Sequence, residues 1–273
     1  MPFVELDDVR LFYTDEGDGS PSLVLIHGLG ADSHDWNWVI PYFRQKYRVV
    51  AYDLRGHGHS STANDYSLDR QADDVVRLMR HLGCEQFVVV GHSAGGTIAT
   101  KAAVANPSAV SAAITVDPAY GAPPWLAEVY DALYERWSSG AAHNHDELMA
   151  MYAEVGRSIV TPDFLSSWNL RRLQATPIDV FWTTYGSLAH VDGLFGRGEM
   201  TTALLRRRAC PTLSFHSLAE QGEWEANHSQ HPLSHAVEWE GSGHYLHIER
   251  PRELVTVATR WLDQVLDTPR EFV

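Results

Sequence analysis

Four continuous apolar segments constrain the fold of this chain more than any other feature of its sequence. They are SLVLIHG at 22–28, RVVAYDL at 48–54, QFVVVGHS at 86–93 and VSAAITVD at 110–117. Uninterrupted runs of this kind are typical of strands that are buried on both faces of a sheet. Helical patterns occur between them, at 67–82 and 94–105. The alternation predicts an α/β protein with a mostly parallel central sheet, right-handed crossovers and flanking helices.

The rest of the chain extends this sheet and interrupts it once. Residues 3–6 and 10–14 have the pattern of two short antiparallel strands, and strand patterns return at 211–217 and 235–241 before a final helix at 251–267. Between 121 and 208 the sequence is typical of helices only, for example at 125–137 and 146–160. We therefore expect an α/β core made of 1–120 and 209–273, with a helical insertion at 121–208.

Composition and charge exclude several classes of partner. Of the 273 residues, 44% are hydrophobic and 21% charged, and the formal net charge is −14. An acidic surface argues against nucleic acid and against anionic membranes as partners. The first residues, MPFVELDDVR, lack the pattern of a signal peptide, and no run reaches the ~18 apolar residues of a membrane helix. We expect a cytoplasmic protein whose two cysteines, Cys84 and Cys210, are free thiols.

The segment GHSAGG at 91–96 is the strongest indication of chemistry. It fits the G-x-S-x-G pattern, and it lies between a predicted strand and a predicted helix. A serine on such a turn stands above the carboxyl edge of the sheet, where open α/β sheets bind their ligands. We predict that Ser93 is a nucleophile.

A serine nucleophile needs a base and a site for the oxyanion. The loop HGLG at 27–30 can direct a backbone N–H toward Ser93, so Leu29 and Ala94 are the candidate oxyanion donors. Of the 15 histidines, His244 follows the last predicted strand in a glycine-rich loop at the same edge of the sheet. We predict that His244 is the base, and that His247 packs or caps instead.

These motifs, HGLG, DLRGHGHS, GHSAGG and GSGHYLHIERP in that order, resemble those of the α/β-hydrolase superfamily, in the branch with a helical cap. The resemblance runs nearly end to end, although the insertion at 121–208 matches no single family. It implies an α/β-hydrolase fold with Ser93 and His244 as nucleophile and base, and Leu29 and Ala94 as the oxyanion hole. It implies a mainly structural role for Asp53, Arg55 and His57.

The third member of the triad departs from the usual pattern of that superfamily. The segment in which the acid commonly lies, PTLSFHSLAEQGEWE, contains no aspartate and has Glu220 in the corresponding position. Asp117 follows the strand after the nucleophile helix, where haloalkane dehalogenase-like and zearalenone lactonase-like enzymes carry their acid. Asp117 is shorter and lies directly at a strand end, whereas SLAEQGE could be a solvated acidic turn. Both acids remain candidates, and we favour Asp117.

The remaining expectations concern the pocket and its surroundings. We expect Gly28, Trp125, Trp182 and Tyr185 to contact the substrate, and the basic run 206–208 to be solvated. Histidines are paired closely at 57/59, 143/145 and 244/247, but no carboxylate or cysteine completes a set at helical spacing. We therefore expect no metal and no cofactor.

These features together predict a serine hydrolase that cleaves a small, largely apolar ester or lactone through an acyl-enzyme. A lactone is slightly favoured through the Asp117 resemblance alone. Two alternatives stay open: a hydrolase of C–C bonds in ring-fission products that uses the same triad, and a ligand receptor that keeps this fold without turnover. The expected partner is a small molecule, with a homodimer left open.

Overall fold

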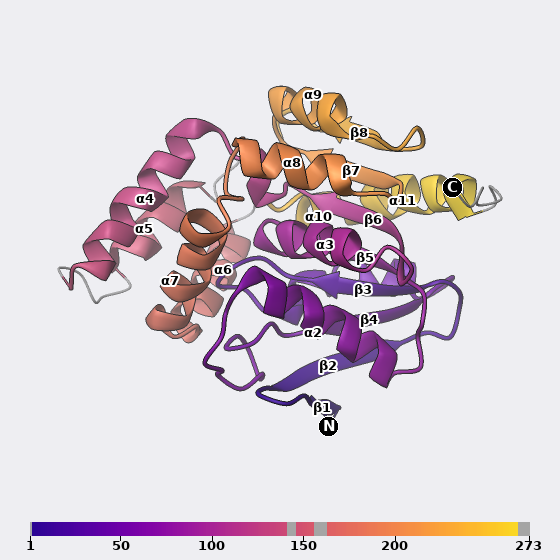
Figure 1. Ribbon diagram of the computed structural model, residues 1–273, viewed down its shortest axis with the longest axis horizontal. Coiled ribbons are helices and arrows are strands. Elements are labelled where there is room, and N and C mark those ends of the chain that lie inside the picture. Colours follow the sequence, from indigo (N-terminus) through magenta and orange to yellow (C-terminus); the bar gives the residue numbers. More distant parts are fainter. Residues whose placement is uncertain (1, 141–145, 156–162, 267–273) are drawn as a thin grey trace.

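The computed structural model describes residues 2–140, 146–155 and 163–266. Eight strands form one sheet in the order β1-β2-β4-β3-β5-β6-β7-β8 (Figure 1). Their bounds are β1 Phe3–Glu5, β2 Arg10–Glu16, β3 Ser22–Ile26, β4 Arg48–Tyr52, β5 Phe87–His92, β6 Val110–Val116, β7 Thr212–His216 and β8 His235–Glu238. β1 and β2 pair antiparallel to their neighbours, and β4, β3, β5, β6, β7 and β8 run parallel. The predicted fold class is confirmed.

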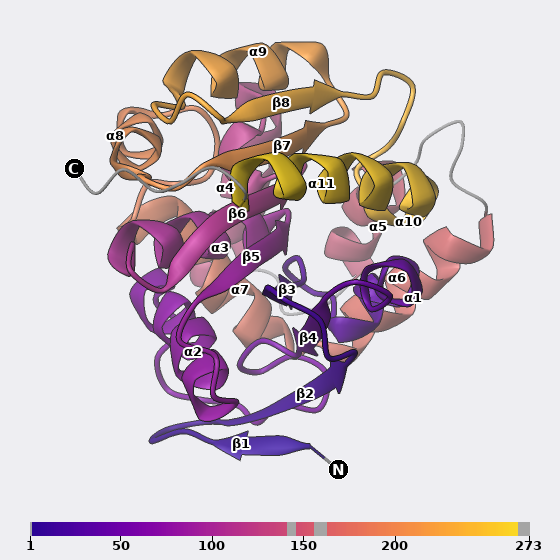
Figure 2. The ribbon, with the colours of Figure 1, turned by 90° about the vertical axis from the view of Figure 1, so that its right-hand side faces the viewer.

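Helices cover both faces of the sheet because the buried strands are apolar on both sides. Along β3, Val24 and Ile26 pack on the face covered by α2 (Leu68–His81) and α3 (Ala94–Ala105). Leu23 and Leu25 alternate with them and pack on the opposite face, against α1 (Ile40–Phe43) and α11 (Pro251–Leu266). Figure 2 shows the sheet between these two layers.

Between β6 and β7 the described residues form helices and no strand, as the sequence predicts. These helices are α4 Pro124–Ser138, α5 Asp146–Val155, α6 Asp163–Ala175, α7 Ile178–Gly186 and α8 Glu199–Arg207. The predicted helix at 146–160 thus appears as α5, and residues 156–160 lie outside the described residues. α4 to α7 gather at one end of the sheet, on the left of Figure 1.

The structure differs from expectation in two polar segments. The segment after β7, which could have been a solvated acidic turn, forms α9 (Ala219–His228). In the basic run 206–208, Arg206 and Arg207 are exposed as expected, whereas Arg208 is buried. The Arg208 guanidinium lies 2.9 Å from the Glu225 carboxylate of α9, and both side chains are 1% exposed. Because a charged pair occupies this buried contact, the sequence lacks the apolar periodicity that would have indicated a helix.

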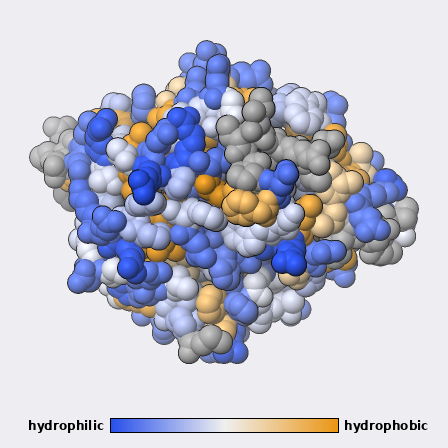
Figure 3. Space-filling model, turned by 180° about the vertical axis from the view of Figure 1, so that it is seen from behind, coloured by the Kyte–Doolittle hydropathy of each residue, from blue (hydrophilic) through white to orange (hydrophobic). Residues whose placement is uncertain are grey.

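Viewed from behind, hydrophobic residues are interspersed among hydrophilic ones (Figure 3). Across the described ranges, no helix combines the length and the apolar character needed to cross a bilayer. Cys84 and Cys210 are buried thiols and do not form a disulfide with each other.

Candidate active site

Ser93 occupies a sharp turn between β5 and α3. Its backbone has φ 53° and ψ −121°, and among the described residues Asp117 is the only other non-glycine residue with positive φ. The Ser93 N–H donates to the carbonyl oxygen of Val116 at 3.0 Å, and the Ser93 carbonyl accepts from Gly96 N–H and Ala119 N–H at 2.9 and 3.0 Å. A strained backbone conformation that several hydrogen bonds hold in place is typical of functional sites. The turn therefore holds the serine rigidly at the carboxyl edge of the sheet.

Small residues let neighbouring backbone segments approach this turn. A Cβ at Gly95 would lie 2.2 Å from the carbonyl oxygen of Ile26, on the adjacent strand. A Cβ at Gly28 would lie 3.1 Å from His92 Nδ1 and 3.2 Å from the Ser93 Cβ. Gly28 thus brings the loop after β3 against the turn of Ser93, although it is not among the residues that line the pocket.

We predict that Gly95→Ala destabilises the protein by about 1–3 kcal/mol, because the added methyl meets a backbone oxygen that cannot move aside cheaply. Urea unfolding followed by circular dichroism measures this change. Gly198→Ala is the control, since the nearest atom to its Cβ would be 3.8 Å away, and it should stay within about 0.5 kcal/mol of the parent. Equal stability of the two variants would contradict this account of the turn.

Asp117 and His244 meet beside Ser93. Asp117 follows β6, and its Oδ2 lies 2.8 Å from His244 Nδ1. Asp117 Oδ1 accepts from the Ser217 N–H at 2.9 Å, and the Ser217 hydroxyl also contacts the carboxylate. Burial by itself raises the pKa of Asp117, but the hydrogen bonds from His244 and Ser217 outweigh it and hold the pKa below its usual value. An ionised Asp117 keeps the proton of His244 on Nδ1 and leaves Nε2 as the basic nitrogen.

Glu220, the other candidate acid, lies elsewhere. It is in the first turn of α9, its side chain is 64% exposed, and its carboxylate pairs with Arg197 at 3.1 Å. The geometry therefore brings Asp117, and not Glu220, to the imidazole of His244.

The loop after β3 is held by His57 and Asp53, to which the family resemblance assigned structural roles. His57 Nδ1 contacts the Arg55 carbonyl at 3.0 Å, which leaves Nε2 to accept from the Gly30 N–H at 3.2 Å. Asp53 accepts from the Ser33 N–H of the same loop at 2.7 Å. The Leu29 and Ala94 amides donate no hydrogen bond to another described residue. Both amides are therefore available to an oxyanion.

The pocket above Ser93 opens to solvent. Its lining is mostly apolar or phenolic, and it consists of Ser93, Asp117, Pro118, Ala119, Ala122, Leu126, Tyr130, Tyr152, Phe195, Gln221, His244 and Tyr245. Such a lining around a few polar groups is typical of small-molecule sites. Another hollow, between α8 and α9, contains none of the predicted site residues.

None of the four predicted substrate contacts, which are Gly28, Trp125, Trp182 and Tyr185, is among the residues that line this pocket. Trp125 lies on the outer side of α4 and is 59% exposed. Trp182 and Tyr185 of α7 are buried against each other, with ring centroids 5.7 Å apart, in the core of the helical insertion. Aromatic residues in the sequence do not distinguish a helix core from a pocket wall, because both environments are apolar. The sequence also missed Tyr152, whose hydroxyl donates to the Leu29 carbonyl at 3.1 Å.

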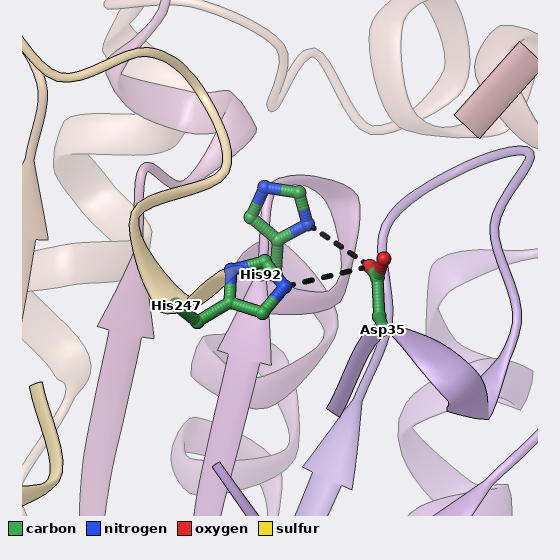
Figure 4. A group of neighbouring side chains, drawn as sticks. All are labelled: Asp35, His92 and His247. Atoms are coloured by element: carbon green, nitrogen blue, oxygen red, sulfur yellow. Dashed lines mark ion pairs between the residues drawn. The ribbon is translucent and has the colours of Figure 1, made fainter. Parts of the chain in front are cut away.

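A buried polar cluster that the sequence did not predict lies next to the site (Figure 4). Asp35 Oδ2 faces His92 Nδ1 at 3.4 Å and His247 Nε2 at 3.7 Å. His92 Nε2 donates to the carbonyl oxygen of His244 at 3.0 Å, so the cluster supports the loop that carries His244. On the other side, Arg172 of α6 lies 2.6 Å from Asp35 Oδ1.

The three donor atoms of Asp35, His92 and His247 lie within 4.8 Å of one another, a spacing compatible with a metal. Arg172, however, already supplies the counter-charge to the only carboxylate of the set. A divalent cation would add further positive charge to fully buried groups, at a large desolvation cost. Burial lowers the pKa of His92 to about 3 and keeps its ring neutral, so the charged pair of this cluster is Arg172 with Asp35. We interpret the cluster as an ion-paired support. The pair His143 and His145 lies outside the described residues.

Comparison with known proteins identifies a family model and relatives that this chain resembles. The family model of the alpha/beta hydrolase fold matches residues 21–167. The bifunctional esterase/perhydrolase DCH of Acinetobacter calcoaceticus is 28% identical over 236 residues, 79% of this chain and 80% of the relative. The structure of Est816, an N-acyl homoserine lactone degrading enzyme, has a TM-score of 0.75 at 22% identity and covers 95% of this chain and 99% of its own.

Other curated relatives are more similar over a shorter stretch. The magnesium-chelatase 30 kDa subunit of Rhodobacter capsulatus is 43% identical over 96 residues, which is 34% of each chain. The match spans about a third of the length of this and two further relatives. The family model nevertheless covers more than half of the residues and includes the serine turn. The chain therefore belongs to the alpha/beta hydrolase fold family.

Proposed function

We propose that the protein is a serine hydrolase that cleaves carboxylic esters or lactones of small, neutral substrates. One observation carries this proposal: Ser93 and Asp117, the two non-glycine residues with positive φ among those described, line one pocket with His244, and Asp117 is hydrogen-bonded to His244. This combination of nucleophile, base and acid serves acyl transfer.

In the proposed mechanism, Ser93 Oγ attacks the carbonyl carbon while His244 Nε2 takes the hydroxyl proton. The N–H groups of Leu29 and Ala94 bind the oxyanion, and each such donor contributes about 3 kcal/mol to the transition state. The imidazolium is stabilised by Asp117 and returns its proton to the leaving oxygen. A water molecule, activated by His244, then releases the acid from the acyl-enzyme.

The pocket supports a neutral substrate. Its described lining includes no lysine or arginine, and its carboxylate and imidazole, those of Asp117 and His244, are paired with each other. Burial raises the pKa of Tyr130 to about 12, so this phenol stays neutral at pH 7. Hydrolysis of C–C bonds in acidic ring-fission products is disfavoured, because none of the described lining residues supplies a cation for a carboxylate. A receptor without turnover is disfavoured by the complete set of catalytic groups.

The names of similar proteins support ester chemistry. The Acinetobacter relative is called an esterase/perhydrolase, and Est816 is titled as a lactone-degrading enzyme. We further propose that residues 121–208 act as a cap over the core formed by 1–120 and 209–273, since Tyr130 of α4 and Tyr152 of α5 line the same pocket as Ser93.

A fluorophosphonate probe tests this function. We expect it to label Ser93 and to abolish hydrolysis of short p-nitrophenyl esters, with many turnovers per protein before labelling. The labelled residue is identified by peptide mass spectrometry. A dienone acid tested in parallel should be a poor substrate. Label on another serine, or full activity of labelled protein, would refute the proposal, and a single turnover would favour the receptor.

A further inference from the structure

Leu29, the proposed oxyanion donor in the loop after β3, lies between two glycines. Gly30 has φ 72°, which glycine adopts without strain, and Gly28 packs against the turn of Ser93. A segment of this composition can rearrange at little steric cost, whereas an oxyanion hole depends on donors whose direction is fixed before the reaction. The hydrogen bonds that hold the two peptide groups of Leu29 therefore decide how well its N–H can act.

Core residues hold the peptide group that carries the Leu29 N–H. The carbonyl of this group belongs to Gly28 and accepts from the Ala31 N–H at 3.2 Å. It also accepts from His27 Nδ1 at 2.8 Å, since His27 Nε2 is already the acceptor of the Leu54 N–H. Because a peptide group is planar, these two contacts restrict the direction of the Leu29 N–H.

The next peptide group is held from the core on one side and from the helical insertion on the other. Its N–H, from Gly30, donates to His57 Nε2 at 3.2 Å, and its carbonyl, from Leu29, accepts from the Tyr152 hydroxyl at 3.1 Å. No other backbone N–H of the described residues donates to that carbonyl. Of the contacts that fix the two peptide groups, the one from Tyr152 is thus supplied by α5.

Tyr152 is itself fixed by the packing of the insertion on this loop. Its ring meets the buried ring of Phe181 of α7 edge-on, with centroids 6.0 Å apart. A Cβ at Gly30 would lie 2.6 Å from Leu173 Cδ1 of α6, so the insertion packs directly on the loop. Burial raises the pKa of Tyr152 well above its usual value, and the phenol therefore keeps the proton that it donates.

We propose that Tyr152 is a positioning residue for the oxyanion hole, and that the cap, through this hydroxyl, supplies one of the contacts that fix the Leu29 N–H. This inference rests on the proposed ester hydrolysis. Without the hydroxyl, the Leu29 carbonyl loses its partner and can find another only if its peptide group turns, which displaces Leu29 between its flexible neighbours. Even a displacement of about 1 Å can cost a large part of the rate.

Tyr152→Phe tests the proposal, because it removes the hydroxyl and keeps the ring that packs on Phe181. We expect kcat/KM for p-nitrophenyl acetate and for p-nitrophenyl butyrate to fall by the same factor, about tenfold or more, since both esters form the same oxyanion. Tyr134→Phe is the matched control. Tyr134 of α4 stacks on His190 outside the pocket lining, and its change should leave kcat/KM within about twofold.

A pair of ketones separates the oxyanion from ordinary binding. Ser93 Oγ can add to the carbonyl carbon of 1,1,1-trifluoro-4-phenylbutan-2-one, the serine proton passes to His244, and the carbonyl oxygen becomes the oxyanion. Its methyl counterpart, 4-phenylbutan-2-one, is far less prone to this addition. In Tyr152→Phe, we expect the Ki of the trifluoromethyl ketone to rise by the factor that kcat/KM loses, while the Ki of the methyl ketone stays within about twofold.

Hydrogen exchange of the Gly30 amide, measured by NMR without ligand, shows whether Tyr152 acts on the loop itself. This amide exchanges only when its bond to His57 opens. We expect faster exchange in Tyr152→Phe than in the parent and in Tyr134→Phe. A tyrosine that only contacts the substrate would leave the exchange unchanged.

Unchanged kcat/KM, unchanged Gly30 exchange, unequal losses on the two esters or equal weakening of the two ketones would each overturn the positioning role of Tyr152. Every one of these results leaves ester hydrolysis intact. Failure of the proposed function has a different signature, namely that the parent protein hydrolyses neither ester and is not inhibited by the trifluoromethyl ketone.

Discussion

Ser93→Ala is expected to lower kcat/KM by at least about three decades while the protein remains folded. The change removes only the nucleophilic oxygen, and Ala keeps the Cβ that already fits at φ 53°. The residual rate would come from substrate binding and from the oxyanion donors, which still act without a nucleophile. Steady-state hydrolysis of a p-nitrophenyl ester measures the loss, and circular dichroism checks the fold.

Ser138→Ala is the matched control for this experiment. Ser138 lies at the exposed end of α4, where its hydroxyl contacts the Glu135 carbonyl at 3.1 Å, and its removal should leave kcat/KM within about twofold. If Ser93→Ala kept a tenth or more of the parental activity in a folded protein, Ser93 would not be the nucleophile.

Asp117→Asn is expected to cost about three to four decades in kcat. The Asp117 carboxylate has two oxygens and faces two N–H donors, from His244 and from Ser217. An asparagine has a single oxygen, so its NH₂ group must face one of these donors. If it faces His244, the imidazole places its proton on Nε2, and this nitrogen can no longer act as the base.

Glu220→Gln is the matched comparison and should cost less than about tenfold. This carboxylate is 64% exposed and pairs with Arg197, an interaction of the kind that contributes little to stability. Both variants are assayed for kcat and KM with the same ester, after their folds are checked. If Glu220→Gln lost most of the parental kcat while Asp117→Asn kept it, the acid would be Glu220. The support for a lactone substrate would then be lost.

The sheet and the serine turn could be predicted because local patterns determine them. Continuous apolar runs such as 22–28 and 86–93 suit strands that are buried on both faces, and the glycines around Ser93 permit the turn. The order of motifs along the chain then placed His244 at the same edge of the sheet. Each of these inferences needs only a short window of sequence and the general rules of parallel sheets.

The choice between Asp117 and Glu220 needed the tertiary structure. Both follow strands that end at the same edge, so the pattern alone allowed both. The decision depends on α9, which turns Glu220 toward Arg197 and solvent, whereas β6 directs Asp117 toward His244. α9 itself escaped prediction, because its buried face is held by the ion pair of Glu225 and Arg208.

Pocket residues were the other feature that only the tertiary structure decided. Trp125 and Tyr152 both lie on helices of the insertion, yet one is exposed and the other lines the site. The same holds for Asp35, His92 and His247, which are distant in sequence and meet in the folded core, where Arg172 of α6 also contacts Asp35. Sequence by itself determined the sheet and placed Ser93 and His244, the proposed nucleophile and base, at one edge of it, because these features follow from local backbone preferences and strand order. The acid, the pocket walls and the buried charges depend on how helices far apart in the chain pack together, and no local pattern encodes that packing.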